Sequence, residues 1–267
     1  MVLRPRIVLT GIALAVAVFL GLTFWHQSQR AALIGLTDRA CTAEGRSVTG
    51  SDFDDWAALC AYREDNLALA NAPSPEVVMI GDSLTERWPG QTTGIVKRGV
   101  GGQSSAQVLL RFRQDALSLK PRIVHILLGT NDLLGLNGPF TIEQFEGNVL
   151  NMTELARLHG AVVVLGTVPP MRDFAGYKPG DPAPDVASLN TVLRKLAQTH
   201  GFGLADYHSV LVRPDGTRRE ELFGEDGLHL TAEGYRALQP VFDDALRRAR
   251  KTTDEPLSAA PDQSPGT

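Results

Sequence analysis

Motifs that would identify several classes of protein are missing from this sequence of 267 residues. No Gly-X-Gly-X-X-Gly follows a strand-like run and no Walker lysine occurs, so the usual signatures of nucleotide binding are absent. Neither Cys-X-X-Cys nor His-Glu-X-X-His occurs, so no metal site is expected. The net charge of −4 offers no basic surface to a nucleic acid. We therefore expect neither a nucleic acid nor a metal as a partner.

Charged residues are also missing from residues 7–25, an apolar run that follows Arg4 and Arg6. As a helix rising ~1.5 Å per residue, the run is about 28 Å long, close to the hydrocarbon thickness of a bilayer. No small-X-small cleavage site follows it directly, so we expect an uncleaved transmembrane signal anchor behind a cytoplasmic stub of residues 1–6. The rest of the chain then lies on the periplasmic or extracellular side. A cleaved signal, and so a secreted protein, is the alternative.

Cysteine is scarce, because Cys41 and Cys60 are the only two in the chain. An even number in an exported chain permits a disulfide, which would stabilise the fold by about 3 kcal/mol in the chain-entropy model. Two unrelated buried thiols are the other interpretation. The spacing alone does not decide between them, since it says nothing of proximity.

From residue 77 onward, short apolar runs alternate with longer helical patterns. The runs cover residues 77–81, 94–99, 123–129, 161–168 and 201–207. The helical patterns cover residues 104–119, 142–159, 185–200 and 232–250. Runs that are apolar throughout suit strands covered on both faces. Their alternation with helices predicts an α/β fold with a parallel sheet and right-handed crossovers.

The regions around these runs complete the expected organisation. Residues 26–50 are predicted to be a tether and residues 51–250 one domain, and the polar tail over 251–267 has too few apolar residues to fold. Residues 169–185 are rich in proline and glycine, so we expect an irregular segment that lines a pocket. A helix is expected over residues 51–70, capped by Ser51 or Asp52, with one apolar face made of Phe53, Trp56, Leu59 and Cys60.

Serine-dependent acyl chemistry needs a nucleophile, a base, a group that orients the base, and donors for the oxyanion. Candidates for all four occur, each at the end of a predicted strand or in a loop. Ser83 follows the first run in "GDSLT", and a group of glycines follows the second in "RGVGGQSS". Asn131 closes the third run in "LLGTND", and Asp226 and His229 stand three residues apart in "GEDGLHLTAEGY". Strands of a parallel sheet end at one edge, where ligands bind, so these residues are expected to meet there.

Each motif also has a purely structural interpretation. In "GDS", Asp82 or Ser83 could simply cap a helix, and we interpret Asp82 as a structural residue that shapes the turn. "GVGG" could be a tight turn, "GTND" an Asx turn and "DGLH" a plain loop. Any one motif alone would leave the function open, whereas their joint occurrence in this order favours a catalytic site.

Six histidines compete for the role of base. His208 is the main rival of His229, because Asp206 precedes it by two residues at the end of the fifth run. His125 lies within the third run and is expected to be packed in the core. The others lie beside the apolar segment or at helix ends, where a cation suits the helix dipole: His26, His159 and His200.

Taken together, the four motifs resemble the sequence blocks of the SGNH or GDSL hydrolase superfamily, over residues 77–246. The resemblance implies that Ser83 is the nucleophile and that Asp226 orients His229 as the base. It implies an oxyanion hole made by the backbone N–H groups of Ser83 and Gly102 and by the Asn131 side chain. It also implies a flavodoxin-like three-layer α/β/α sandwich with a five-stranded parallel sheet, and no cofactor.

The expected function is therefore a membrane-anchored, extracytoplasmic serine esterase that hydrolyses carboxylic esters of acyl or acetyl groups. Small acyl esters, acylated polysaccharides and lipids are the expected substrates. The alternative is an O-acyltransferase that uses the same triad to acylate an envelope or extracellular polysaccharide. A catalytically silent binding module is disfavoured, because no residue of the constellation is missing. The sequence does not predict the oligomeric state.

Overall fold

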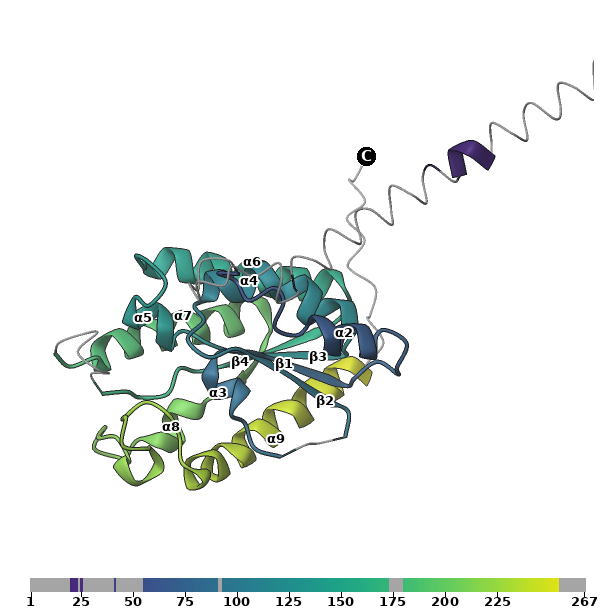
Figure 1. Ribbon diagram of the computed structural model, residues 1–267. Coiled ribbons are helices and arrows are strands. Elements are labelled where there is room, and N and C mark those ends of the chain that lie inside the picture. Colours follow the sequence, from purple (N-terminus) through teal and green to yellow (C-terminus); the bar gives the residue numbers. More distant parts are fainter. Residues whose placement is uncertain are drawn as a thin grey trace, which may run out of the picture. The chain divides into compact units, whose positions relative to one another are not determined.

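The computed structural model describes residues 20–23, 25, 41, 55–90, 93–172 and 180–254 (Figure 1). The chain divides into two units, Met1–Asp55 and Trp56–Thr267, and the strands and helices named below belong to the second. Most of the expected anchor over 7–25, of the tether over 26–50 and of the tail over 251–267 lies outside the described residues. Within the described ranges, no helix is both long and apolar enough to span a bilayer.

The two cysteines do not carry free thiols. Cys41 and Cys60 are both disulfide-bonded. The structure thus favours the bridge over two unrelated thiols, a choice that the spacing of the cysteines could not make.

Five parallel strands form the sheet, as the sequence predicts. They are β1 (Val77–Gly81), β2 (Ile95–Gly99), β3 (Ile123–Leu127), β4 (Val162–Gly166) and β5 (Gly203–Ala205), in the order β2-β1-β3-β4-β5. The chain leaves β1 for β2 on one side and then crosses to β3 on the other. The carboxyl end of β1 is therefore the switch point at which open α/β sheets place their ligands.

Helices cover both faces of the sheet, which makes three layers (Figure 1). Three long helices lie on one face: α4 (Ser105–Asp115), α6 (Ile142–Leu158) and α7 (Ala183–His200). On the other face lie α8 (Tyr207–Leu211) and α9 (Ala232–Asp254). Shorter elements complete the domain: α2 (Arg63–Leu69), α3 (Ser83–Glu86), α5 (Thr130–Leu134), η1 (Leu117–Leu119) and η2 (Glu220–Leu222). β1 and β3 are buried along their whole length, in keeping with their predominantly apolar sequences.

The prediction of a helix over residues 51–70 is wrong in its described part: within residues 55–70 only Arg63–Leu69 is α-helical, and most of residues 55–62 form turns. Ala58 has a left-handed φ of 52°, which a right-handed helix cannot contain. Side chains from elsewhere hold these turns: Gln103 Nε2 donates to the Ala57 carbonyl at 2.8 Å, and Gln107 Nε2 donates to that of Trp56. The proposed apolar face is not formed, since Trp56 is 42% exposed.

His125 is a core residue, as predicted. Its Nε2 lies 2.8 Å from the Tyr207 hydroxyl, and its ring meets those of Trp88 and Phe242 edge-on. The side chain is fully buried between β3 and α9, and burial lowers its pKa to about 3. His125 therefore stays neutral inside the fold at pH values where an exposed histidine would gain a proton.

The glycine that ends β2 allows α3 to approach the sheet. A Cβ at Gly99 would lie 2.6 Å from the Asp82 carbonyl oxygen and closer still to the Glu86 backbone nitrogen. Both neighbours are backbone atoms, so no side-chain rotation would relieve the overlap. The position of Ser83, which begins α3, thus depends on the absence of a side chain in the neighbouring strand.

We expect Gly99→Ala to lower the free energy of unfolding by ~3 kcal/mol or more, because the overlap forces backbone shifts. Gly147→Ala is the matched control: Gly147 lies in α6 with open space at its Cβ, and alanine there should stabilise by ~0.5–1 kcal/mol. Urea unfolding of both variants measures the difference. Equal effects of the two substitutions would contradict the close approach.

Acid should destabilise the wild-type protein partly through His125. Between pH 6.5 and 3 the unfolded chain binds a proton at this residue and the folded chain does not. The free energy of unfolding therefore falls as the pH falls through this window, by up to ~1.4 kcal/mol per pH unit from this group. His125→Gln does not titrate, so urea unfolding at pH 7, 6 and 5 should show a shallower loss for the variant. Parallel profiles would refute the assignment.

Candidate active site

Ser83 stands just beyond the carboxyl end of strand β1, which lies between β2 and β3 in the sheet. The strand ends at Gly81, and Asp82 then caps α3 by accepting the Leu84 backbone N–H at 2.9 Å. Ser83 is the first residue of the helix and is 8% exposed. The short polar sequence after an apolar run thus does two things: it turns the chain, and it presents the serine hydroxyl at the sheet edge.

Ser83, His229 and Asp226 form one hydrogen-bonded series. His229 Nε2 lies 2.9 Å from Ser83 Oγ, and His229 Nδ1 lies 2.6 Å from Asp226 Oδ2. A carboxylate only accepts, so the ring donates from Nδ1 to Asp226 and its Nε2 accepts the serine proton. The structure therefore brings together three of the residues that the sequence singled out, two of them from the carboxyl-terminal part of the chain.

The Asp226 carboxylate is held in its charged form. Burial by itself raises its pKa, but hydrogen bonds from the His229 ring and from the backbone N–H groups of Leu228 and His229 outweigh that effect. The net result lowers the pKa to about 2. Asp226 is therefore ionised at neutral pH and can stabilise a positive charge on the neighbouring imidazole.

The loop that carries this pair is closed on itself and joined to α9. Phe223 and Leu230 form an antiparallel bridge, and the Gly224 N–H donates to the His229 carbonyl at 2.8 Å. The Thr231 hydroxyl then accepts an N–H in the first turn of the helix. The geometry of Asp226 relative to His229 is thus fixed by the loop itself.

The other two residues expected at the oxyanion hole come from different elements: Asn131 lies in α5, and Gly102 lies in the loop that follows β2. Asn131 Nδ2 donates to the Gln103 carbonyl at 2.9 Å and lies 3.3 Å from Asp82 Oδ2. Gly102 has a left-handed φ of 78°, and its carbonyl accepts Asn137 Nδ2 at 2.7 Å. That bond fixes the orientation of the loop backbone, a contribution from Asn137 that the sequence analysis missed.

Asp82 has an environment that the sequence did not reveal. It shapes the turn as expected, but its carboxyl group is also fully buried next to Ser83. Burial raises its pKa to about 7, the charge of Asp132 adds to the rise, and the hydrogen bond from the Leu84 N–H opposes it. The charge beside the serine therefore changes close to neutral pH.

The rival base His208 is not part of this constellation. Its backbone N–H donates to Thr167 Oγ1 at 2.9 Å. The carboxylate of Asp206 is occupied by Arg194, at 3.1 Å, and by the Thr167 hydroxyl, at 3.0 Å. The hydrogen-bond geometry thus favours His229 as the partner of Ser83.

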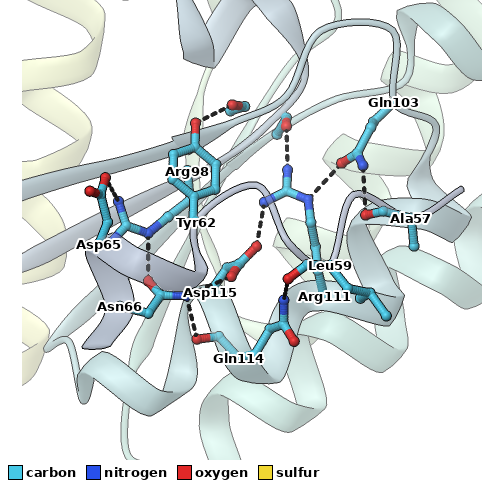
Figure 2. Close-up of polar contacts among 12 residues, drawn as sticks. Ala57, Leu59, Tyr62, Asp65, Asn66, Arg98, Gln103, Arg111, Gln114 and Asp115 are labelled. Carbon is cyan, nitrogen blue, oxygen red and sulfur yellow. Dashed lines mark hydrogen bonds and ion pairs between the residues drawn. The ribbon is translucent and has the colours of Figure 1, made fainter. Parts of the chain in front are cut away.

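A buried polar network lies behind the site, and the sequence analysis missed it (Figure 2). At its centre Arg111 is fully buried and donates to the Gly81 carbonyl at 2.8 Å, to Gln103 Oε1 at 2.6 Å and to Asp115 Oδ2 at 3.2 Å. Asp115 also accepts Asn66 Nδ2 at 2.7 Å. The available signal was a pair of opposite charges four residues apart, Arg111 and Asp115, which lie beside Val108 and Phe112 on the buried side of the helix.

The network continues toward β2. Arg98 is buried, donates to Asn66 Oδ1 at 3.0 Å and stacks over the Tyr62 ring at 4.6 Å (Figure 2). The Tyr62 hydroxyl donates to the Gly99 carbonyl. These bonds join α2 to β2 and α4, behind the loop that carries Gly102. Among the described residues no group of three or more His, Cys, Asp or Glu side chains could hold a metal.

Comparisons with known proteins identify the family of this chain and several of its relatives. The model of the GDSL-like lipase/acylhydrolase family matches residues 74–237. A Bacteroides fragilis NCTC 9343 structure described as an acylhydrolase is 33% identical, with a TM-score of 0.66, over 74% of this chain and 98% of that one. A GDSL-like lipase of Bacteroides thetaiotaomicron VPI-5482 is 31% identical, with a TM-score of 0.68, over 73% and 99%. The uncharacterized lipoprotein YqeF of Bacillus subtilis strain 168 is 26% identical over 56% of this chain and 72% of its own.

Arg111→Met should be strongly destabilising, by ~3–5 kcal/mol, because it leaves the buried Asp115 carboxylate without its counter-ion. The double variant Arg111→Met/Asp115→Leu should recover part of that loss, since no unpaired charge remains. Arg113→Met, on the exposed side of the same helix, is the control and should change stability by less than ~0.5 kcal/mol. Urea unfolding compares the three, and a single variant as stable as the control would contradict the role of the network.

Proposed function

The chain belongs to the GDSL-like lipase/acylhydrolase family, and we propose that it is a serine esterase whose nucleophile is Ser83. The observation that carries the proposal is the hydrogen-bonded series from Asp226 through His229 to Ser83, with distances of 2.6 and 2.9 Å. A hydroxyl, an imidazole and an ionised carboxylate in this arrangement are what acyl transfer through serine requires.

In the proposed reaction, Ser83 Oγ attacks the ester carbonyl carbon as His229 Nε2 takes its proton. Asp226 stabilises the imidazolium that forms, and the proton then passes to the departing alcohol as its bond to carbon breaks. Water attacks the acyl-serine next and gives its proton to His229. Breaking of the acyl–Oγ bond releases the free acid and returns that proton to the serine.

The oxyanion would be bound by the backbone N–H groups of Ser83 and Gly102 and by the Asn131 side chain. The hydrogen bonds of Asn131 support this role. One N–H is held by the Gln103 carbonyl at 2.9 Å, whereas the contact with Asp82 at 3.3 Å is long for a hydrogen bond. The more weakly held N–H is thus available to a developing negative charge beside Ser83.

We also propose that the enzyme is anchored on the extracytoplasmic side of a membrane through residues 7–25. The uncharged run behind Arg4 and Arg6 supports this placement, because its length matches a bilayer core. The name of the Bacillus subtilis relative, a lipoprotein, is consistent with attachment to a membrane.

Ser83→Ala should lower kcat on p-nitrophenyl acetate by at least about three orders of magnitude, because no other group supplies the nucleophile. Asn131→Ala should lower kcat by ~10²- to 10³-fold, the usual effect of losing one oxyanion donor. Ser118→Ala, at an exposed serine of η1, should leave the rate unchanged. Retention of more than about a tenth of the activity by Ser83→Ala would overturn the proposal.

The same assay distinguishes hydrolysis from acyl transfer when a saccharide acceptor is added. An esterase releases one free acid for every ester consumed. The O-acyltransferase alternative uses the same residues but puts a sugar hydroxyl in place of water, so acylated saccharide would form at the expense of free acid.

A further inference from the structure

We propose that a cavity beside the oxyanion side chain binds the saccharide part of an acylated neutral carbohydrate, an inference that rests on the proposed esterase function. The cavity has a volume of about 410 Å³ and lies between the amino-terminal end of α4, the segment after α5, and α6. That volume is within the range of small-molecule sites. Asn131 forms part of its wall.

The cavity adjoins the groups that would act on the ester. Asn131 both lines it and contacts Asp82, the residue before Ser83. Asn137 also lines it, and the same amide group donates to the Gly102 carbonyl at 2.7 Å. A molecule in the cavity therefore lies against two of the residues that fix the loops around Ser83, so the cavity is placed to hold the part of a substrate beyond its ester group.

Neutral amides make up most of the polar wall. Asn137, Gln144, Asn148 and Asn151 each offer both a donor and an acceptor, which is what a sugar hydroxyl needs from its partner. The side chains of Gln144 and Asn151 are exposed and make no hydrogen bond within the described part of the chain. They are therefore free to bind hydroxyl groups.

No cation lines the wall among the residues that the structure describes. Asp132 is the one ionisable residue of that lining, and its carboxylate accepts the backbone N–H and the hydroxyl of Ser105. A phosphate or a carboxylate would therefore find no counter-ion there. This favours an uncharged ligand over an anionic lipid headgroup.

Aromatic side chains supply the apolar part of the wall. Trp56 is 42% exposed, and Phe140 is half-buried against Phe145. A hydrogen bond from Gln107 to the Trp56 carbonyl fixes the backbone that carries the indole. A sugar ring has an apolar face of C–H groups and a rim of hydroxyls, so a wall of flat rings and amides matches both. A fatty acyl chain would leave the amides unpaired.

The test compares acetyl esters of two different alcohols, a nitrophenol and a saccharide. Initial rates are measured on p-nitrophenyl acetate and on partially acetylated cello-oligosaccharides, for the wild type, Trp56→Ala and Asn151→Ala. Each substitution should raise KM for the saccharide ester about five- to tenfold, the effect of losing ~1 kcal/mol of contact, and change its kcat by less than about twofold. Rates on p-nitrophenyl acetate should stay within about twofold, which also verifies that the variants fold. Asn71→Ala, at an exposed asparagine that does not line the cavity, is the control and should change neither substrate.

Three results would overturn the inference and leave the esterase proposal intact: serine-dependent turnover of p-nitrophenyl acetate with no turnover of the saccharide esters, equal effects of the variants on both substrates, or a raised KM for p-nitrophenyl octanoate in place of the saccharide. The last would assign the cavity to the acyl chain. Turnover of p-nitrophenyl acetate that persists in Ser83→Ala would instead remove the esterase proposal, and the saccharide site with it.

Discussion

Arg111 places a positive charge, removed from solvent, between the end of β1 and the loop that follows β2. Its hydrogen bonds reach Gly81, Gln103 and Asp115, which come from three different parts of the domain. An ion without water is tolerated only where fixed partners surround it, so the charge requires all three groups to hold their places. Gly81 lies two residues before Ser83. The position of Ser83 therefore depends on the hydrogen bonds that the buried charge of Arg111 requires.

Gln103 connects the buried Arg111 to groups nearer the surface. Its side chain accepts from Arg111 and donates to the Ala57 carbonyl, while its own carbonyl accepts from Asn131. One residue thus connects the buried charge, the proposed oxyanion donor and the turn that presents Trp56 at the cavity. Through its backbone and side-chain hydrogen bonds, Gln103 joins the proposed oxyanion donor and the wall of the cavity in one hydrogen-bond network.

The sequence predicts the sheet well because most of its strands are predominantly apolar, as strands covered on both faces are. The positions of Ser83 and Asn131 at the sheet edge also follow from it, since each comes just after a predicted strand and parallel strands end at a common edge. His229 was instead expected from its glycine-containing loop and from the nearby Asp226. The sequence does not predict the turns over residues 55–62, because hydrogen bonds from distant glutamines override a helical pattern of apolar residues. The network around Arg111 was not predicted either, because its partners are scattered along the chain and no local pattern identifies them.

Asp226 and His229 share one short loop, whereas Ser83 lies 146 residues from His229. Only one long-range closure therefore has to be made to complete the constellation, and it is made when α9 packs against the sheet. The base and its orienting carboxylate therefore form one structural unit, whose geometry is fixed by its own loop and which is attached to α9. Such a unit could be exchanged between related chains, or moved by recombination, without changes to the sheet edge that carries Ser83.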